Sequence, residues 1–226
     1  MRQLLPEAVD PVDPLVVYGD LPAAGGRPSV RLNMIASLDG AISVAGRSGA
    51  LGGPADKELF HVLRSLADVV LVGAGTVRAE RYGPAQVPIA VVSRSCGLDW
   101  GAPFFTEQKA RPIVITVTGA PDDLRARAAE VADVVIAGDD DVDLARAVGA
   151  LGDRGMRSVL CEGGPTLNTQ LVAARLVDEL CLTVSPHLVG GDGPRLLAGA
   201  GLADVPRLNL RGACEADGFL FLRFRP

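Results

Sequence analysis

Three short segments combine glycine with a carboxylate or a hydroxyl group directly after an apolar run that is typical of a buried strand. They are residues 37–40 (Ser-Leu-Asp-Gly), 73–76 (Gly-Ala-Gly-Thr) and 162–166 (Glu-Gly-Gly-Pro-Thr). Ligands of open α/β sheets bind at the carboxyl ends of the strands, so all three segments are candidates for one site. Paired glycines before a helix let backbone N–H groups approach a phosphate. Segment 162–166 has this form, although the Gly-x-Gly-x-x-Gly fingerprint of Rossmann folds is absent.

Two carboxylates, Asp39 and Glu162, stand at these strand ends, where a carboxylate can orient a ring amino group or take part in proton transfer. The alternatives are a turn-capping aspartate, because Asp-Gly is a common turn, and a salt-bridged glutamate. For Glu162 we favour a functional role. Arg94 lies between Ser93 and Ser95 after another apolar run, an arrangement that suits a phosphate monoester such as the 2′-phosphate of NADPH. Its alternative is an exposed loop arginine.

Hydrophobic periodicity indicates the elements that must position these residues. The predicted strands cover 30–36, 68–73, 87–93, 112–118, 133–137, 158–161, 179–185 and 219–225. The predicted helices cover 56–66, 122–130, 141–154 and 167–176, with a short helix after Thr76. This alternation predicts an α/β fold with a mostly parallel central sheet, helices on both faces and an antiparallel strand pair at the C-terminus. Residues 1–28, rich in proline, are expected to form an irregular arm, and 29–226 a single domain.

Composition excludes several classes of function. The net charge of -5 argues against nucleic acid or an acidic membrane as partner, because polyanion binding needs clustered positive charge. The four cysteines have no metal-ligand spacing, so we expect buried thiols and no metal site. No signal peptide is recognisable, and no apolar run reaches the roughly 20 residues of a membrane span. We therefore expect a cytoplasmic protein.

Longer stretches resemble the reductase domain of bacterial riboflavin-biosynthesis deaminase-reductases. They are residues 32–40, Leu63-Arg64, 72–77, 161–167, 176–180 and 185–191, in order and at fitting spacing over about residues 30–200. The resemblance implies a dihydrofolate-reductase-like fold, usually a homodimer. It also implies transfer of a hydride from NADPH to C1′ of a phosphorylated ribosylamino-pyrimidine. The motifs fit a pyrimidine with or without its 2-amino group.

Site residues follow position by position from this resemblance and from the residue chemistry above. Expected substrate contacts are Ser48, Arg64, Gly83 and Glu162, with Arg64 on the 5′-phosphate and Glu162 on the pyrimidine. Expected catalytic residues are Asp39, Glu162 and Asn33, with Asp39 or a bound water relaying the proton. Expected NADPH contacts are Ile35, Ala50, Gly73, Gly75, Thr76, Glu80, Ser93, Arg94, Gly163, Gly164, Pro165, Thr166, Leu167 and Asn168.

Two departures from the family pattern stand out. Many members have lysine at the position of Asn33, and residues 81–84 (Arg-Tyr-Gly-Pro) replace the usual Asp-Pro-x-Leu-Thr-x-Arg stretch. The second basic contact to the substrate phosphate must come from elsewhere, from Arg81 or Arg78. The zinc-deaminase signature is missing, so we expect a reductase alone. The rival hypotheses are a dihydrofolate or other pteridine reductase on the same fold and a non-catalytic nucleotide-binding protein.

Overall fold

Runs rich in valine, isoleucine and leucine form the strands, as the shape of these side chains favours. The computed structural model describes residues 1–80, 82 and 85–226. Within these residues the strands are β1 (Arg2–Leu5), β2 (Ser29–Ser37), β3 (Val69–Gly73), β4 (Ile89–Val92), β5 (Ile113–Thr116), β6 (Asp133–Ile136), β7 (Ser158–Cys161), β8 (Glu179–Ser185), β9 (Asn209–Ala216) and β10 (Phe219–Arg225). The helices are α1 (Pro14–Tyr18), α2 (Pro54–Ser65), α3 (Ala74–Ala79), α4 (Pro103–Thr106), α5 (Asp122–Val131), α6 (Leu144–Asp153) and α7 (Pro165–Ala173).

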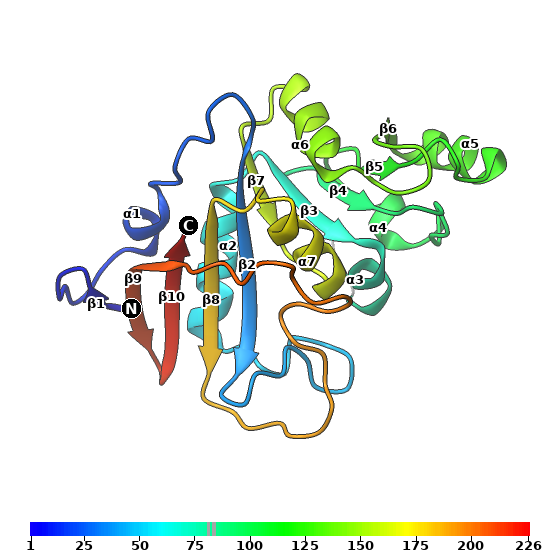
Figure 1. Cartoon of the computed structure of the whole chain (residues 1–226). Coiled ribbons are helices and arrows are strands. Elements are labelled where there is room, and N and C mark those ends of the chain that lie inside the picture. The colour runs from blue at the N-terminus through cyan, green and yellow to red at the C-terminus, as the bar shows by residue number, and fades with distance from the viewer. Residues whose placement is uncertain (81, 83–84) are drawn as a thin grey trace.

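The strands join in one sheet in the order β1-β9-β10-β8-β2-β7-β3-β4-β5-β6 (Figure 1). From β8 to β6 neighbouring strands are parallel, whereas β10, β9 and β1 extend the sheet with antiparallel pairs. The predicted mostly parallel sheet and the antiparallel pairing of the segment at 179–185 with that at 219–225 are therefore confirmed.

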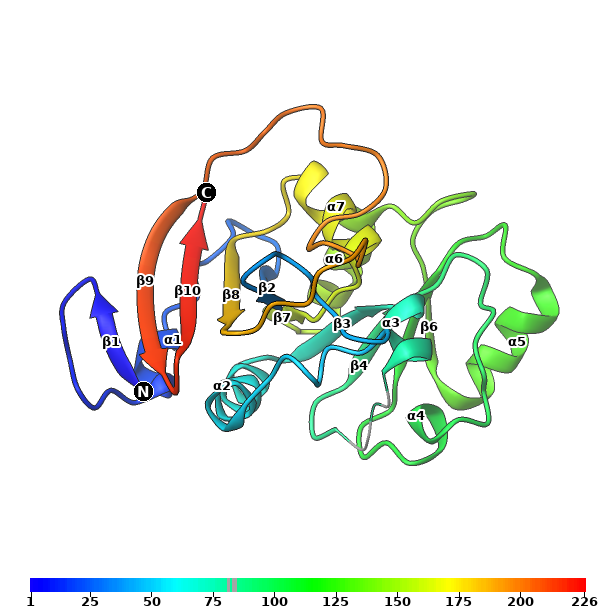
Figure 2. The same ribbon diagram turned by 90° about the horizontal axis from the view of Figure 1, so that it is seen from below.

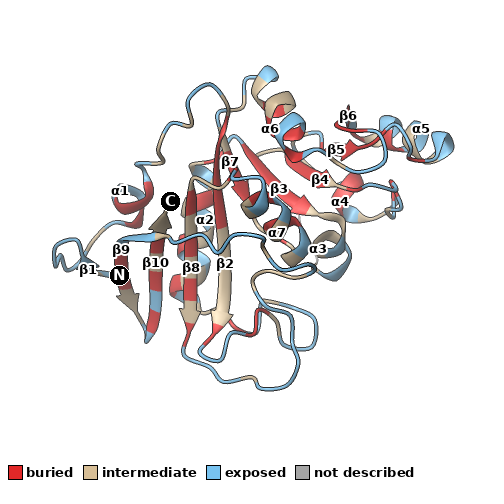
Figure 3. Cartoon of the chain, viewed as in Figure 1, coloured by how far each residue is buried: buried red, intermediate tan, exposed pale blue. Residues whose placement is uncertain are grey.

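Two hydrophobic cores lie on opposite faces of this sheet, because successive side chains of a strand point to opposite sides. In β3, Val70 and Val72 join the core beneath α1, α2, α4 and α5, whereas Val69 and Leu71 join the core beneath α6 and α7. Figure 2 shows these two helical layers, and Figure 3 shows that the central strands are buried. The prediction of helices on both faces is confirmed. Within the described chain, no helix is both long and apolar enough to cross a membrane.

The prediction of an irregular N-terminal arm is wrong in part, since β1 and α1 form within it. Strand β1 pairs with β9, and α1 buries Val17 and Tyr18 against the sheet. The sequence analysis also missed β9 and α4. The predicted starts of α2 and α7 were too late, and that of α6 was too early. The true starts are marked by a proline in the first turn of α2 and of α7 and by the N-cap Asp143 of α6.

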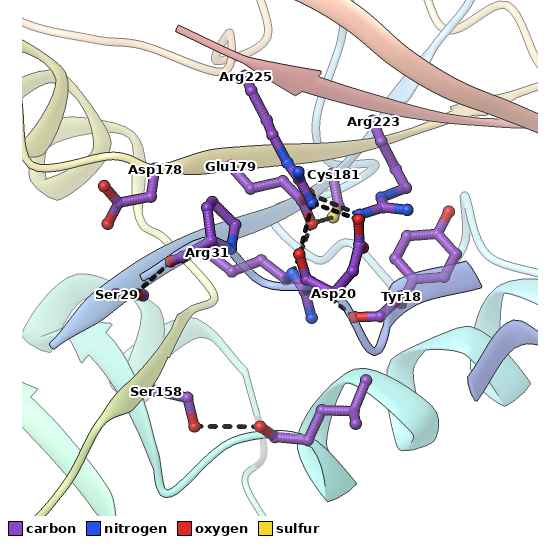
Figure 4. A network of polar contacts seen from close by, with 12 residues as sticks. Tyr18, Asp20, Ser29, Arg31, Ser158, Asp178, Glu179, Cys181, Arg223 and Arg225 are labelled. Carbon is purple, nitrogen blue, oxygen red and sulfur yellow. Dashed lines mark hydrogen bonds and ion pairs between the residues drawn. The ribbon is translucent and has the colours of Figure 1, made fainter. Parts of the chain in front are cut away.

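The arm is fastened to the sheet by a buried cluster of charges around Glu179, the first residue of β8 (Figure 4). Its side chain is 0% exposed and accepts hydrogen bonds of 2.8 Å from each of Arg31, Arg223 and Arg225. Arg31 donates onward to the backbone carbonyl of Tyr18, and Arg223 and Arg225 also pair with Asp20. Three strands and the arm therefore meet at one carboxylate.

Glu179→Gln is expected to lower the free energy of unfolding by about 3–5 kcal/mol, because it leaves buried guanidinium groups without their counter-charge. Urea unfolding measures this. The control Glu215→Gln breaks the exposed pair with Arg2 and should cost less than about 1 kcal/mol. If the two substitutions lowered the free energy of unfolding equally, Glu179 would not be the centre of a stabilising buried charge cluster.

The same cluster predicts a pH dependence. Burial alone would raise the pKa of Glu179, but the charge of Arg31 and the contacts with Arg223 and Arg225 outweigh it and hold the pKa below its ordinary value. A lowered folded-state pKa stabilises the protein above the pKa of the unfolded chain, and this contribution is lost as the pH falls through the folded-state pKa. The stability difference between the wild type and Glu179→Gln should therefore shrink in acid.

Candidate active site

A cavity of about 1290 Å³ opens at the carboxyl ends of β2, β3, β4 and β7, where the sequence analysis expected a ligand. Most of the predicted site residues line it together. They are Asn33, Ile35, Ser48, Arg64, Gly73, Gly75, Thr76, Glu80, Ser93, Arg94, Glu162, Gly164, Pro165, Thr166 and Leu167. Strand β7 lies between β2 and β3, so the three glycine-containing segments meet at one edge of the sheet.

One wall of the cavity consists largely of glycine backbone. The N–H of Gly73 donates to the carbonyl of Gly163 at 2.8 Å, which joins the end of β3 to the turn before α7. Gly164 is the N-cap of α7, and a Cβ atom there would lie only 2.8 Å from Oγ1 of Thr76. At Gly75 a Cβ would meet nothing within 4 Å. Backbone N–H groups are therefore open to a ligand along this wall, beside the N-terminus of α7.

The cavity also contains an ion pair between Arg64 and Glu162. Nε and Nη2 of Arg64 donate to the two oxygens of Glu162 at 2.7 and 2.8 Å, and the hydroxyl of Tyr82 donates to Glu162 at 3.1 Å. The guanidinium carbon lies 4.3 Å from the ring centroid of Phe60. Burial alone would lower the pKa of Arg64, but the hydrogen bonds and charge of Glu162 raise it.

This pairing is a contact that the sequence analysis did not expect. The sequence analysis placed Arg64 on the substrate phosphate and Glu162 on the pyrimidine, at opposite ends of one substrate, whereas the two side chains bind each other. The partners are 98 positions apart in the chain, so no local pattern reveals the contact. In the described chain, Nη1 of Arg64 makes no hydrogen bond and is the nitrogen left for a ligand.

Asp39 is also placed differently from the prediction. Its carboxylate accepts hydrogen bonds from the hydroxyl of Ser37 at 2.5 Å and from the N–H groups of Gly190 and Val189 at 2.6 and 3.1 Å. These hydrogen bonds lower its pKa to about 2, and Asp39 does not line the cavity. A carboxyl group this acidic is a poor proton donor at neutral pH. Asp39 instead fastens the largely exposed segment 186–208 to the end of β2 through the N–H groups of Val189 and Gly190.

Three further expected residues do not line the cavity. Ala50 is exposed beside it, and Gly163 is buried behind the glycine wall. Asn168 is buried as well, and its amide donates to the carbonyl of Leu196 at 2.9 Å. Gly83 lies outside the described residues, as does Arg81.

Two other pairs involve predicted residues. Oε1 of Glu80 accepts hydrogen bonds from the N–H and the hydroxyl of Ser48 at 2.8 and 2.9 Å. Arg94 lines the cavity and forms an exposed ion pair with Asp141 at 3.0 Å, whereas Ser93 beside it is buried.

The sequence analysis missed several lining residues, which are Asp56, Lys57, Phe60, Tyr82, Asp141 and the loop at 189–194. For the α2 members a signal exists, because Asp56, Phe60 and Arg64 follow one another at intervals of four and share one face of the helix. The cysteines are buried and unpaired as expected. No group of three or more potential metal ligands occurs among the residues that the structure describes.

Comparisons with known proteins find relatives along most of the chain. The family model described as the RibD C-terminal domain matches residues 28–218. A 2,5-diamino-6-ribosylamino-4(3H)-pyrimidinone 5′-phosphate reductase of Methanothermobacter thermautotrophicus is 34% identical, over 82% of this chain and 92% of the relative. The protein of the same description from Aquifex aeolicus is 30% identical, over 80% and 88%.

A solved structure is similar along nearly the whole chain. It is a pyrimidine reductase-like protein of Corynebacterium diphtheriae, with a TM-score of 0.82, 28% identity, and coverage of 95% of this chain and 98% of its own. This likeness and those to more distant reductase structures confirm the expected dihydrofolate-reductase-like fold.

The ion pair in the cavity yields a stability prediction. Arg64→Ala and Glu162→Gln should each lower the free energy of unfolding, since each leaves a largely buried charge without its partner. The double variant should lose less than the sum of the two by about 0.5–3 kcal/mol. A urea-unfolding cycle measures this coupling. The exposed pair Arg111 and Asp133 is the control, for which we expect a coupling below about 1 kcal/mol. Additive losses at Arg64 and Glu162 would show that the pair is not formed in solution.

Proposed function

Because the chain belongs to the RibD C-terminal domain family, we propose that it reduces a ribosylamino-pyrimidine 5′-phosphate to the ribitylamino form in riboflavin biosynthesis. The names of its relatives support this activity and do not favour a folate reductase or a non-catalytic protein. A reductase of this kind implies a nicotinamide cofactor, and we propose NADPH. A homodimer and a cytoplasmic location remain predictions of the sequence analysis.

The observation that supports the proposal most directly is that one cavity contains both a glycine wall and a charged, aromatic end. The wall, from Gly73–Thr76 and 164–167, suits the pyrophosphate and nicotinamide half of the cofactor, because three of its residues are glycines without side chains and α7 begins beside it. The other end, with Arg64, Phe60 and Asn33, offers a cation, a ring and an amide to a phosphorylated, flat and hydroxylated substrate. A hydride donor and acceptor would therefore lie side by side.

The reaction adds a hydride to C1′ and a proton to the attached nitrogen. The ribosylamino ring must first open to an imine, or to an equivalent electrophilic C1′. The bound cofactor supplies the hydride, and the protein supplies position and charge. In our proposal Asn33 contacts the ribose hydroxyls, Nη1 of Arg64 contacts the 5′-phosphate, and Glu162 holds Arg64 in place. Since Asp39 lies outside the cavity, we propose a water molecule as the immediate proton source.

An activity assay tests this function. Purified protein should oxidise NADPH in the presence of a ribosylamino-pyrimidine 5′-phosphate, and dihydrofolate should give no comparable rate. Oxidation with dihydrofolate alone would favour a pteridine reductase, and oxidation with neither would contradict the proposal.

Arg94 is the proposed ligand of the 2′-phosphate, which distinguishes NADPH from NADH. Arg94→Ala should weaken NADPH binding by about 10-fold, the low end of a charge-assisted contact because the site is exposed. NADH binding should change little. Fluorescence titration with both cofactors measures this, and Arg111→Ala, an exposed arginine outside the cavity, is the control. Equal losses for NADPH and NADH would remove Arg94 from the 2′-phosphate.

A further inference from the structure

A carboxylate that the sequence analysis missed, Asp56, lines the substrate end of the cavity. It belongs to the first turn of α2 and is half-buried. The hydroxyl of Thr183, a buried residue of β8, hydrogen-bonds with it. A Cβ atom at position 52 would lie 2.8 Å from its Oδ2, so the glycine at that position leaves room for the carboxylate.

The other carboxylates of the cavity are engaged or exposed. Both oxygens of Glu162 bind Arg64, Glu80 binds Ser48, and Asp141 pairs with Arg94. Asp192 is exposed on the segment 186–208. In the part of the chain that the structure describes, Asp56 forms no ion pair. Burial raises its pKa, and the Thr183 hydroxyl and the charge of Lys57 on the same helix oppose this shift only in part.

Asp56 lies in line with two other cavity residues on α2. Asp56, Phe60 and Arg64 are spaced at intervals of four, and eight residues of α-helix rise about 12 Å. One face of the helix therefore presents a pair of acceptor oxygens at one end, an aromatic ring in the middle and a guanidinium at the other end. This order suits a substrate with a pyrimidine at one end and a phosphate at the other.

We propose that Asp56 recognises the 2-amino group of the pyrimidine and so selects the diamino-pyrimidinone over its deaminated counterpart. The edge of a 2-amino-4-oxopyrimidine presents two parallel N–H donors, from the 2-amino group and from N3. Two carboxylate oxygens accept both. The deaminated ring has a C2 carbonyl in place of the amino group. Its oxygen is an acceptor and would face a carboxylate oxygen of Asp56, which is also an acceptor. This inference rests on the proposed function and transfers the pyrimidine contact from Glu162 to Asp56.

The test compares kcat/KM for 2,5-diamino-6-ribosylamino-4(3H)-pyrimidinone 5′-phosphate and for the corresponding 2,4-dioxo compound, with NADPH saturating. The wild type should favour the diamino substrate by about 10- to 150-fold, the value of a charge-assisted hydrogen bond. Asp56→Asn offers one acceptor and one donor, which complement a C2 carbonyl and N3–H. The ratio should therefore fall to near one or below. NADPH affinity should not change.

Glu58→Gln is the matched control, an exposed carboxylate of the same helix that does not line the cavity. It should leave both rates unaltered. Thr183→Val keeps the carboxylate but removes the hydroxyl that positions it, and should lower the ratio by a smaller factor. This second variant decides the question if Asp56→Asn does not fold.

Three results would overturn the inference. If Asp56→Asn lowers kcat/KM equally for both substrates and also lowers the melting temperature, then Asp56 only stabilises the N-terminus of α2. If the wild type reduces both pyrimidines equally well, the inference fails while the proposed function stands. If the wild type reduces neither, the proposed function fails and the inference with it.

Discussion

The carboxylate of Glu179 is the contact that joins the antiparallel strand β10 and the N-terminal arm to the parallel part of the sheet. A fully buried charge is costly unless it is paired and hydrogen-bonded, and three guanidinium groups meet this demand here (Figure 4). Each arginine belongs to a strand that neighbours β8, so contacts with one residue link β2, β8 and β10. Alternate residues of β8 share a face, which places Thr183 on the same side as Glu179. The network at one end of β8 thus sets the position of the hydroxyl beside Asp56 at the other.

Strand order determines the cavity as much as any single residue does. The chain leaves β2 and enters β3 before it returns to place β7 between them. This insertion brings Glu162 within reach of Arg64 and sets the carbonyl of Gly163 against the N–H of Gly73. The proposed substrate end of the cavity lies next to the glycine wall because β2, β7 and β3 are adjacent strands of the sheet.

Local sequence patterns predicted the elements well where a run was apolar and periodic. The strands around Val70 and Val159 and the helix around Leu59 and Leu63 are of this kind, and so are the glycines that follow strands. Strand β1 was missed because its side chains are largely exposed, and β9 because its first three residues are exposed; the two strands pair with each other from opposite ends of the chain. Local propensity is weak in such strands, and the pairing itself supplies the order.

Long-range pairing also decides which charged residues remain available to a ligand. Arg64 and Glu162 each look like a substrate contact in its own motif, yet two nitrogens of Arg64 and both oxygens of Glu162 are used in the ion pair between them. Asp39 stands in a conspicuous strand-end motif and is used to fasten a loop. Asp56 stands in no motif, but it faces the cavity with the hydroxyl of Thr183 as its hydrogen-bond partner and Lys57 as a nearby charge, and in the described chain it forms no ion pair. A carboxylate that the fold does not neutralise must find donors elsewhere, and in this cavity a ligand is the source of donors that the position of Asp56 favours.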